Sequence, residues 1–288
     1  MALWLLLHAV AHLAGYGAVP PFRESAVDRI LLFKLTLTPL LVLICMLITR
    51  RWGAFAGGVA AGLPVVSGPL SFFLTLEQGT AFSAQAAYNT LLGIDANGLA
   101  AVAYPWLAVL GVPWYAAIAL SLGIYFLGGW FVQLLPHWPL GAVGFSLLSP
   151  LLVLLCLPRQ AGRDVPQPQP HQWLMLVQMA FGSLLVYAVT ETAHCLGAGW
   201  SGILMFFPVM ICAMVPFIHA TQGPWTVVRV YRGLMAGWFG CIAFFAIVMP
   251  LVEITPLWLC YALAVGAALG TSAVVSAVQR RRAGGAAS

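Results

Sequence analysis

Long apolar runs separated by short polar breaks are the dominant pattern of this 288-residue sequence. A helix that crosses a membrane needs about 20 mostly apolar residues, and Gly, Pro and charged residues mark where such runs end. The pattern predicts ten membrane-spanning helices, within a range of nine to eleven because several breaks are only a few residues long. The predicted spans are 2–19, 29–49, 53–76, 80–108, 113–135, 139–157, 172–193, 197–220, 224–252 and 256–278.

Composition narrows the class of protein. Hydrophobic residues make up 62% of the chain and charged residues only 7%, whereas about a quarter of a soluble domain is charged. We therefore expect an all-α polytopic membrane protein whose first partner is the lipid bilayer. A cytosolic enzyme, a disordered protein and a nucleic-acid binder are excluded. The net charge of +5 does not indicate nucleic acid, since the arginines are scattered among apolar runs.

The basic residues predict the orientation, because cytoplasmic loops are enriched in Lys and Arg. With ten spans and a cytoplasmic N-terminus, nine arginines fall on the inner side and only Arg23 and Arg29 on the outer side. The sequence thus predicts a multi-pass protein of the bacterial cytoplasmic (inner) membrane with both termini in the cytoplasm. The nine inner residues are Arg50, Arg51, Arg159, Arg163, Arg229, Arg232, Arg280, Arg281 and Arg282.

An internal repeat divides the chain into a first five-helix unit, 1–138, and a second, 139–288. Sliding the sequence against itself by 144 residues aligns spans one to five with spans six to ten. Because five is odd, equivalent helices would cross the membrane in opposite directions, as in many secondary transporters. Between 53 and 79 the matched pairs are Gly53/Gly197, Ala54/Ala198, Gly58/Gly202, Pro64/Pro208, Val65/Val209, Phe73/Phe217, Gln78/Gln222 and Gly79/Gly223.

This plan of ten spans in two inverted halves resembles bacterial drug/metabolite transporters of the EamA kind. The bile-acid-symporter and auxin-carrier group is similar in the same way, and its crossing helices are broken. The resemblance covers the span plan of the whole chain and rests on architecture, without a diagnostic motif. It implies alternating access, and no functional residue is transferred from either family.

The third and eighth spans each contain prolines that are expected to break or kink a helix. In lipid the freed backbone groups must be satisfied by protein or cavity water, so such breaks lie in the interior. One interpretation is a substrate or ion site where the two spans meet; the other is a pair of kinked packing helices. The candidate residues are Pro64, Ser67, Gly68 and Pro69 in the third span and Pro208 and Pro216 in the eighth.

Gln78 and Gln222 end those two spans, each followed by a glycine. They could be paired gates at the two mouths of a pathway, or residues of ordinary helix ends closed by glycine. Glu77 has no acidic counterpart in the second half, and could be a proton or cation site or a solvated loop acid. His219 adds polarity near the end of the eighth span.

Asp95 is the strongest single candidate, because a carboxylate in the middle of a span is expensive and is by default functional. If the fourth span covers 80–108, Asp95 and Asn97 lie near its middle, where the acid could exchange protons. The alternative is a shorter span in which 95–98 forms a turn. Lys34 could be a counter-charge, or it could extend its ammonium group toward the membrane surface.

No catalytic motif is present: the sequence lacks GxSxG, HExxH, a P-loop and a Cys/His cluster. We expect no enzyme, no cofactor and no metal site. The favoured function is a secondary transporter of an unidentified small molecule by alternating access, with proton coupling as one option. The alternatives are a structural or assembly partner of a membrane complex and an intramembrane lipid-handling enzyme. Monomer and homodimer both stay open.

Overall fold

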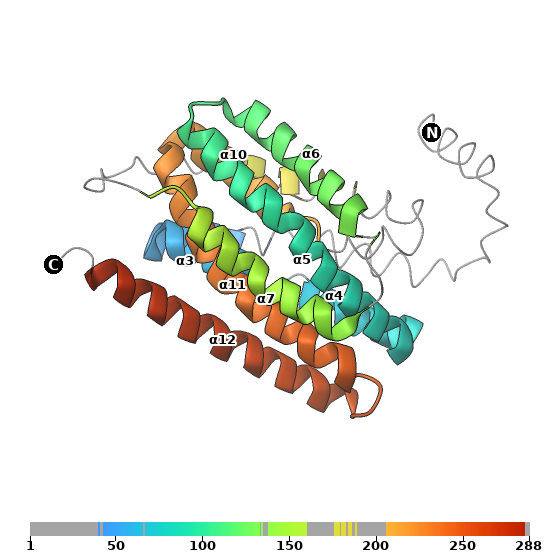
Figure 1. Ribbon diagram of the computed structural model, residues 1–288. Coiled ribbons are helices and arrows are strands. Elements are labelled where there is room, and N and C mark those ends of the chain that lie inside the picture. The colour runs from blue at the N-terminus through green and yellow to red at the C-terminus, as the bar shows by residue number, and fades with distance from the viewer. Residues whose placement is uncertain are drawn as a thin grey trace, which may run out of the picture.

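A computed structural model describes residues 40, 43–65, 67–132, 134, 138–159, 206–285 and single positions between 176 and 188. This part of the chain is helical and contains no strand (Figure 1). Its helices are α3 (Ala54–Gly62), α4 (Ser67–Gln78), α5 (Thr80–Val109), α6 (Trp114–Val132), α7 (Pro139–Cys156), α10 (Val209–Gln222), α11 (Pro224–Leu251) and α12 (Leu257–Gly285).

Six apolar segments in these residues are long enough to cross a membrane. They comprise Ala54–Phe73, which runs over the end of α3 into α4, and the helices α5, α6, α7, α11 and α12. Each coincides with a span predicted from the sequence. Predicted span 2–19 and parts of 29–49, 172–193 and 197–220 lie outside the described residues. The described part of the chain is therefore that of an α-helical membrane protein.

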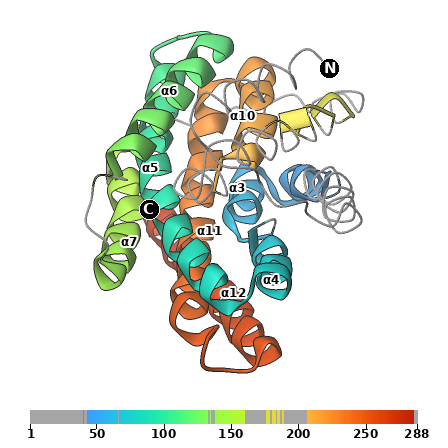
Figure 2. The same ribbon diagram turned by 90° about the vertical axis from the view of Figure 1, so that its right-hand side faces the viewer.

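Helices α5 and α11 form the centre of the bundle. Within their most apolar stretches, 56% of α5 and 61% of α11 is buried, against 28% in both α7 and α12. The two central helices contact each other; α5 also contacts α4, α6 and α7, and α11 contacts α3, α7, α10 and α12. Figure 2 shows α3 and α4 on the opposite side of this pair from α6 and α7. Large buried side chains such as Trp238 and Phe245 fill the core.

Helix α3 lies directly against the backbone of α11. Gly58 and Gly62 of α3 face Gly233 and Gly237 of α11, and a Cβ atom added at any of the four would meet backbone of the other helix. Both pairs are spaced by four residues, which is the pattern that allows close helix packing in membranes. The close-packing role expected for glycine therefore holds for this part of the third span.

Candidate functional site

The third predicted span is broken between α3 and α4, as its prolines predict. The Val65 N–H donates to the Leu63 carbonyl at 2.7 Å, and the Gly68 N–H donates to the Pro64 carbonyl at 2.8 Å. Pro64 is thus the central residue of a tight turn. Pro69 is in the first turn of α4, where a missing backbone N–H costs no helical hydrogen bond.

This break packs against the central helix α11. The Ser67 side chain lies within hydrogen-bond reach of Cys241 on α11. A Cβ atom added at Gly68 would lie 3.4 Å from the ring of Phe244, also on α11. The predicted residues of the first break are therefore brought to the interior of the bundle, which is where freed backbone groups can be satisfied.

A second turn with the same hydrogen bonds precedes α10. The Val209 N–H donates to the Phe207 carbonyl at 2.7 Å, and the Cys212 N–H donates to the Pro208 carbonyl at 2.9 Å. Pro208 has φ −76° and ψ 56°, the conformation of an inverse γ-turn. Each of these bonds is the counterpart of one at the first break, 144 residues earlier. Pro216 is buried inside α10.

The two Gln-Gly pairs end α4 and α10 with matching backbone conformations. Gly79 has φ 88° and ψ 171°, and Gly223 has φ 82° and ψ 173°. Positive φ with extended ψ is a region that only glycine enters readily, so glycine ends both helices in an extended conformation and not in the left-handed one of the usual glycine cap. Gln78 is exposed and Gln222 is half-buried. Their role as gates stays a prediction.

Asp95 lies near the middle of the 30 residues of α5, which is continuous from Thr80 to Val109. The alternative interpretation, a turn at 95–98, is therefore wrong. In apolar surroundings the backbone N–H and C=O groups are best satisfied by hydrogen bonds within the helix, and this outweighs the turn preference of these residues. Ser146 of α7 donates to the Leu91 carbonyl at 3.0 Å and lies 3.3 Å from Asp95 Oδ2. Asp95 Oδ1 is buried without a hydrogen-bond partner.

The other coupling candidates do not reach Asp95 within the described residues. Lys34 lies outside them. Glu77 is in the last turn of α4, far from the middle of α5. Asn97 is 2% exposed and follows Asp95 on the same helix. Asp95 is thus an acid in the middle of a long apolar helix, without a counter-charge among the described residues.

A cluster of four hydroxyl groups, which sequence analysis missed, joins α4, α5 and α12. Thr75 Oγ1 lies 2.7 Å from both Ser83 Oγ and Tyr261 Oη, and Ser71 Oγ lies 3.0 Å from Tyr261 Oη. Thr75 also donates to the Ser71 carbonyl at 2.8 Å. The spacing of Ser71 and Thr75 by four residues on one helix face was the available signal. Because each hydroxyl group has a partner, this cluster needs no ligand.

His219 faces the opposite end of α5. Its Nδ1 lies 3.4 Å from the hydroxyl oxygen of Tyr104, whose ring stacks on that of Tyr231. At 1.5 Å per residue, Tyr104 is about 14 Å along α5 from Asp95, and Ser83 is about 18 Å away in the other direction. The predicted candidates therefore form separate polar positions along α5 rather than one cluster.

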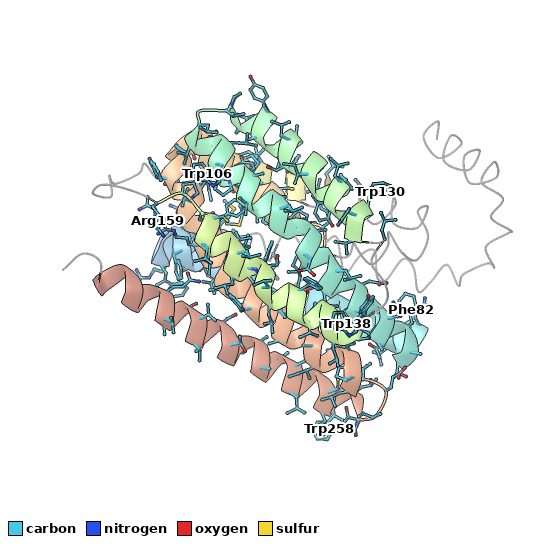
Figure 3. The ribbon with its side chains drawn as sticks, in the orientation of Figure 1. Phe82, Trp106, Trp130, Trp138, Arg159 and Trp258 are labelled. Carbon is cyan, nitrogen blue, oxygen red and sulfur yellow. The ribbon has the colours of Figure 1, made fainter. Side chains whose placement is uncertain are left out.

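Aromatic and basic side chains mark the two ends of the bundle. Figure 3 shows Trp106 and Arg159 at one end and Trp138 and Trp258 at the other. These three tryptophans are at least 44% exposed, as interfacial anchors are. Arg232 donates to the Pro158 carbonyl at 3.1 Å, which brings two arginine-bearing segments together at the first end.

Among the described residues no group of three or more His, Cys, Asp or Glu side chains is placed to hold a metal ion. In comparisons with known proteins, no protein-family model, no curated protein and no solved structure matches this chain.

Proposed function

We propose that this protein is a secondary transporter that moves a small metabolite by alternating access. The observation that carries the proposal is the pair of matching turns at Pro64 and Pro208, each of which precedes a short helix. A γ-turn followed by a short helix and a Gln-Gly end occurs twice, with corresponding hydrogen bonds 144 residues apart. The first turn interrupts an apolar span, the second lies in the predicted eighth span, and transporters use discontinuous helices of this kind to bind substrate.

The proposal includes two inverted five-helix halves. Support comes from the elements that follow each break: a short helix, a long central helix with an internal proline, and a peripheral apolar helix. These are α4, α5 and α6 in the first half and α10, α11 and α12 in the second. An offset of five spans reverses the direction of crossing, so two similar halves can exchange conformations and give inward-open and outward-open states of similar energy.

The proposed pathway runs beside α5 and α11, between the two breaks. Thr75 and His219 occupy equivalent positions 144 residues apart, one in the hydroxyl cluster and the other against Tyr104. In an inverted repeat these positions belong to opposite membrane faces. Asp95, between them, is the proposed coupling site for a proton.

Alternating access is tested by labelling single cysteines at Thr75 and His219. Each variant is made in the full-length chain with the native cysteines replaced, and membrane-impermeant maleimide is added to right-side-out and inverted vesicles. A panel of amino acids, organic acids, sugars and nucleosides is then screened. We expect one class to raise labelling at one position and lower it at the other.

A cysteine at Glu253, which is exposed in the loop between α11 and α12, is the control. Its labelling should come from one membrane face and should not respond to any metabolite. If Thr75 and His219 are unlabelled from both faces under all conditions, the breaks are packing kinks and the transporter proposal is wrong. Changes in the same direction at both positions would also contradict alternating access.

A further inference from the structure

Asp95, Ser146 and the Leu91 carbonyl form a short hydrogen-bonding chain between the central helix α5 and the outer helix α7. We propose that Asp95 binds a proton, and that the resulting neutral carboxyl group latches α7 onto α5 through Ser146. This inference deepens the proposed function, on which it rests for its role in transport. It assigns a residue of α7 that the sequence did not suggest, Ser146, as the positioning partner of the acid.

Ser146 has fewer protons to donate than it has neighbouring acceptors. The Ser146 hydroxyl group has one proton, yet its oxygen lies 3.0 Å from the Leu91 carbonyl oxygen and 3.3 Å from Asp95 Oδ2. A carbonyl oxygen and an ionised carboxylate are both acceptors only. With Asp95 ionised, one proton must serve two acceptors, so one of the two contacts is not a full hydrogen bond.

With Asp95 protonated, both hydrogen bonds form. The Oδ2 hydroxyl group of the acid donates to Ser146 Oγ, and Ser146 donates its own proton to the Leu91 carbonyl. The two hydrogen bonds then run in one direction, from Asp95 through Ser146 to the Leu91 carbonyl, and each proton has one acceptor. The neutral acid also tolerates the position of Oδ1, which is buried without a partner, since burying an unpaired charge costs far more than burying a neutral group.

No charged group near Asp95 in the described residues offsets an ionised carboxylate. Arg232 bonds the Pro158 carbonyl, which is twelve residues, or about 18 Å, beyond Ser146 along the chain. Glu77 lies beyond the start of α5, about 22 Å along that helix from Asp95. The other titratable residues on helices packed against α5 do not hydrogen bond to Asp95; they are Tyr115, Tyr125, Cys156, Arg229, Tyr231 and Cys241.

Release of the proton changes the contact between the two helices. Asp95 loses its only donor group, and the proton passes to water in the pathway. The single Ser146 proton can then be donated either to the Leu91 carbonyl or to the carboxylate. The ionised acid is then stabilised best by water or by a cationic group, either of which separates α5 from α7. Gly98 makes this interface tight, because a Cβ atom added there would meet the Ser149 side chain.

Infrared difference spectroscopy on the full-length protein in lipid nanodiscs tests the proton site. We expect a carbonyl stretching band of a protonated carboxyl group at neutral pH, and its loss in Asp95→Asn. In Ser146→Ala the band should move to higher frequency, because the acid loses its hydrogen-bond acceptor. Ser149→Ala, one turn along α7, is the matched control and should leave the band in place. Absence of the band in the natural sequence, or no shift in Ser146→Ala, overturns the proposal.

The latch itself is tested by spin labels at Leu99 and Leu148, which are exposed on α5 and α7. The distance between the labels should increase from acidic to alkaline buffer, and Asp95→Asn should hold it at the acidic value. A distance that does not respond to pH overturns the latch. Neither measurement requires a substrate. If both support the latch while cysteine labelling does not respond to any metabolite, transport alone is rejected. If cysteine labelling responds while both latch measurements fail, the latch alone is rejected.

Discussion

Three acidic residues fall within the described part of the chain: Glu77, Asp95 and Glu253. Glu77 is in the last turn of α4, and Glu253 is exposed in the loop after α11. Asp95 alone lies in the middle of a long apolar helix, one turn after Leu91 and opposite Ser146 on α7. Its position, more than its chemical type, distinguishes it from the other acids.

Asp95→Asn is expected to abolish proton-driven transport while leaving the protein folded. The amide keeps the size of the acid and can donate to Ser146, so packing between α5 and α7 should persist, but it cannot bind and release a proton. Uptake into proteoliposomes with an imposed pH gradient, using the metabolite found by cysteine labelling, should fall to the level of empty liposomes. Glu253→Gln, in the exposed loop, should retain uptake. Full activity of Asp95→Asn would remove Asp95 from the coupling site.

Gly79→Ala and Gly223→Ala should each destabilise the protein, by about 1–3 kcal/mol for a non-glycine residue forced into this backbone region. Both glycines have φ above +80° with extended ψ. Neither would meet an atom within 4 Å if a Cβ were added, so backbone strain is the whole cause. Thermal unfolding in detergent measures the loss. Gly144→Ala, on an exposed helix face with the same open space, should be neutral or slightly stabilising; equal losses in all three would contradict the explanation.

At the level of single residues, the sequence predicted features that depend on position within a span or on local backbone conformation. Hydropathy alone put Asp95 at mid-span, and glycine after glutamine predicted the two helix ends. The hydroxyl cluster around Tyr261 could not be predicted, because Ser and Thr occur throughout apolar spans with their protons bonded to their own helix. Which of them meet across helices depends on how α4, α5 and α12 pack.

Between elements, the contact of α3 with α11 depends on glycine. Gly237→Ala should destabilise the protein by about 1–3 kcal/mol, the usual cost of overpacking, because its Cβ would meet the backbone of Val59 and Gly62. Gly123→Ala on α6 is the matched control, since nothing lies within 4 Å of an added Cβ there. The difference in unfolding temperature between the two variants is the measurement. A Gly237→Ala variant as stable as Gly123→Ala would show that the two helices are not so close.

The hydroxyl cluster should couple α4 to α12. In a double-mutant cycle of Thr75→Val and Tyr261→Phe, we expect a coupling free energy of about 0.6 kcal/mol, and no more than about 1.7 kcal/mol, the range for hydrogen bonds between membrane helices. Pairing Thr75→Val with Tyr115→Phe, whose ring is 61% exposed, should give none. Equal coupling in both cycles would mean that the Thr75–Tyr261 bond contributes nothing specific.

The sequence predicted where helices begin and end better than it predicted which helices pack together. The start of α7 and α11 at a proline and the end of α4 and α10 before a glycine match their local signals. The partnership of α3 with α11 had no such signal in a single sequence, because Gly58 and Gly237 are far apart along the chain. Glycine spacing shows that a helix can pack closely, without showing against which neighbour.

For the whole molecule, the arginine-bearing segments predict the orientation. Arg159 and Arg232 belong to segments that meet at one end of the bundle, and Figure 1 shows the C-terminal end of α12 at the same end. We expect a C-terminal affinity tag to be cleaved by added protease in inverted vesicles and protected in right-side-out vesicles. The opposite pattern would place this end outside and contradict the predicted orientation.

The two matching breaks also have a mechanical consequence. Helix α4, of 12 residues, and helix α10, of 14, each run from a γ-turn at one end to a single glycine at the other. Each is therefore a stiff rod of about 18–21 Å held between two one-residue pivots. Rotation about the pivots can change the tilt of either rod while every hydrogen bond inside α5 and α11 stays formed. A change of tilt confined to these rods spans about 18–21 Å, roughly two thirds of the ~30 Å hydrocarbon core, and the long central helices can serve as a fixed frame.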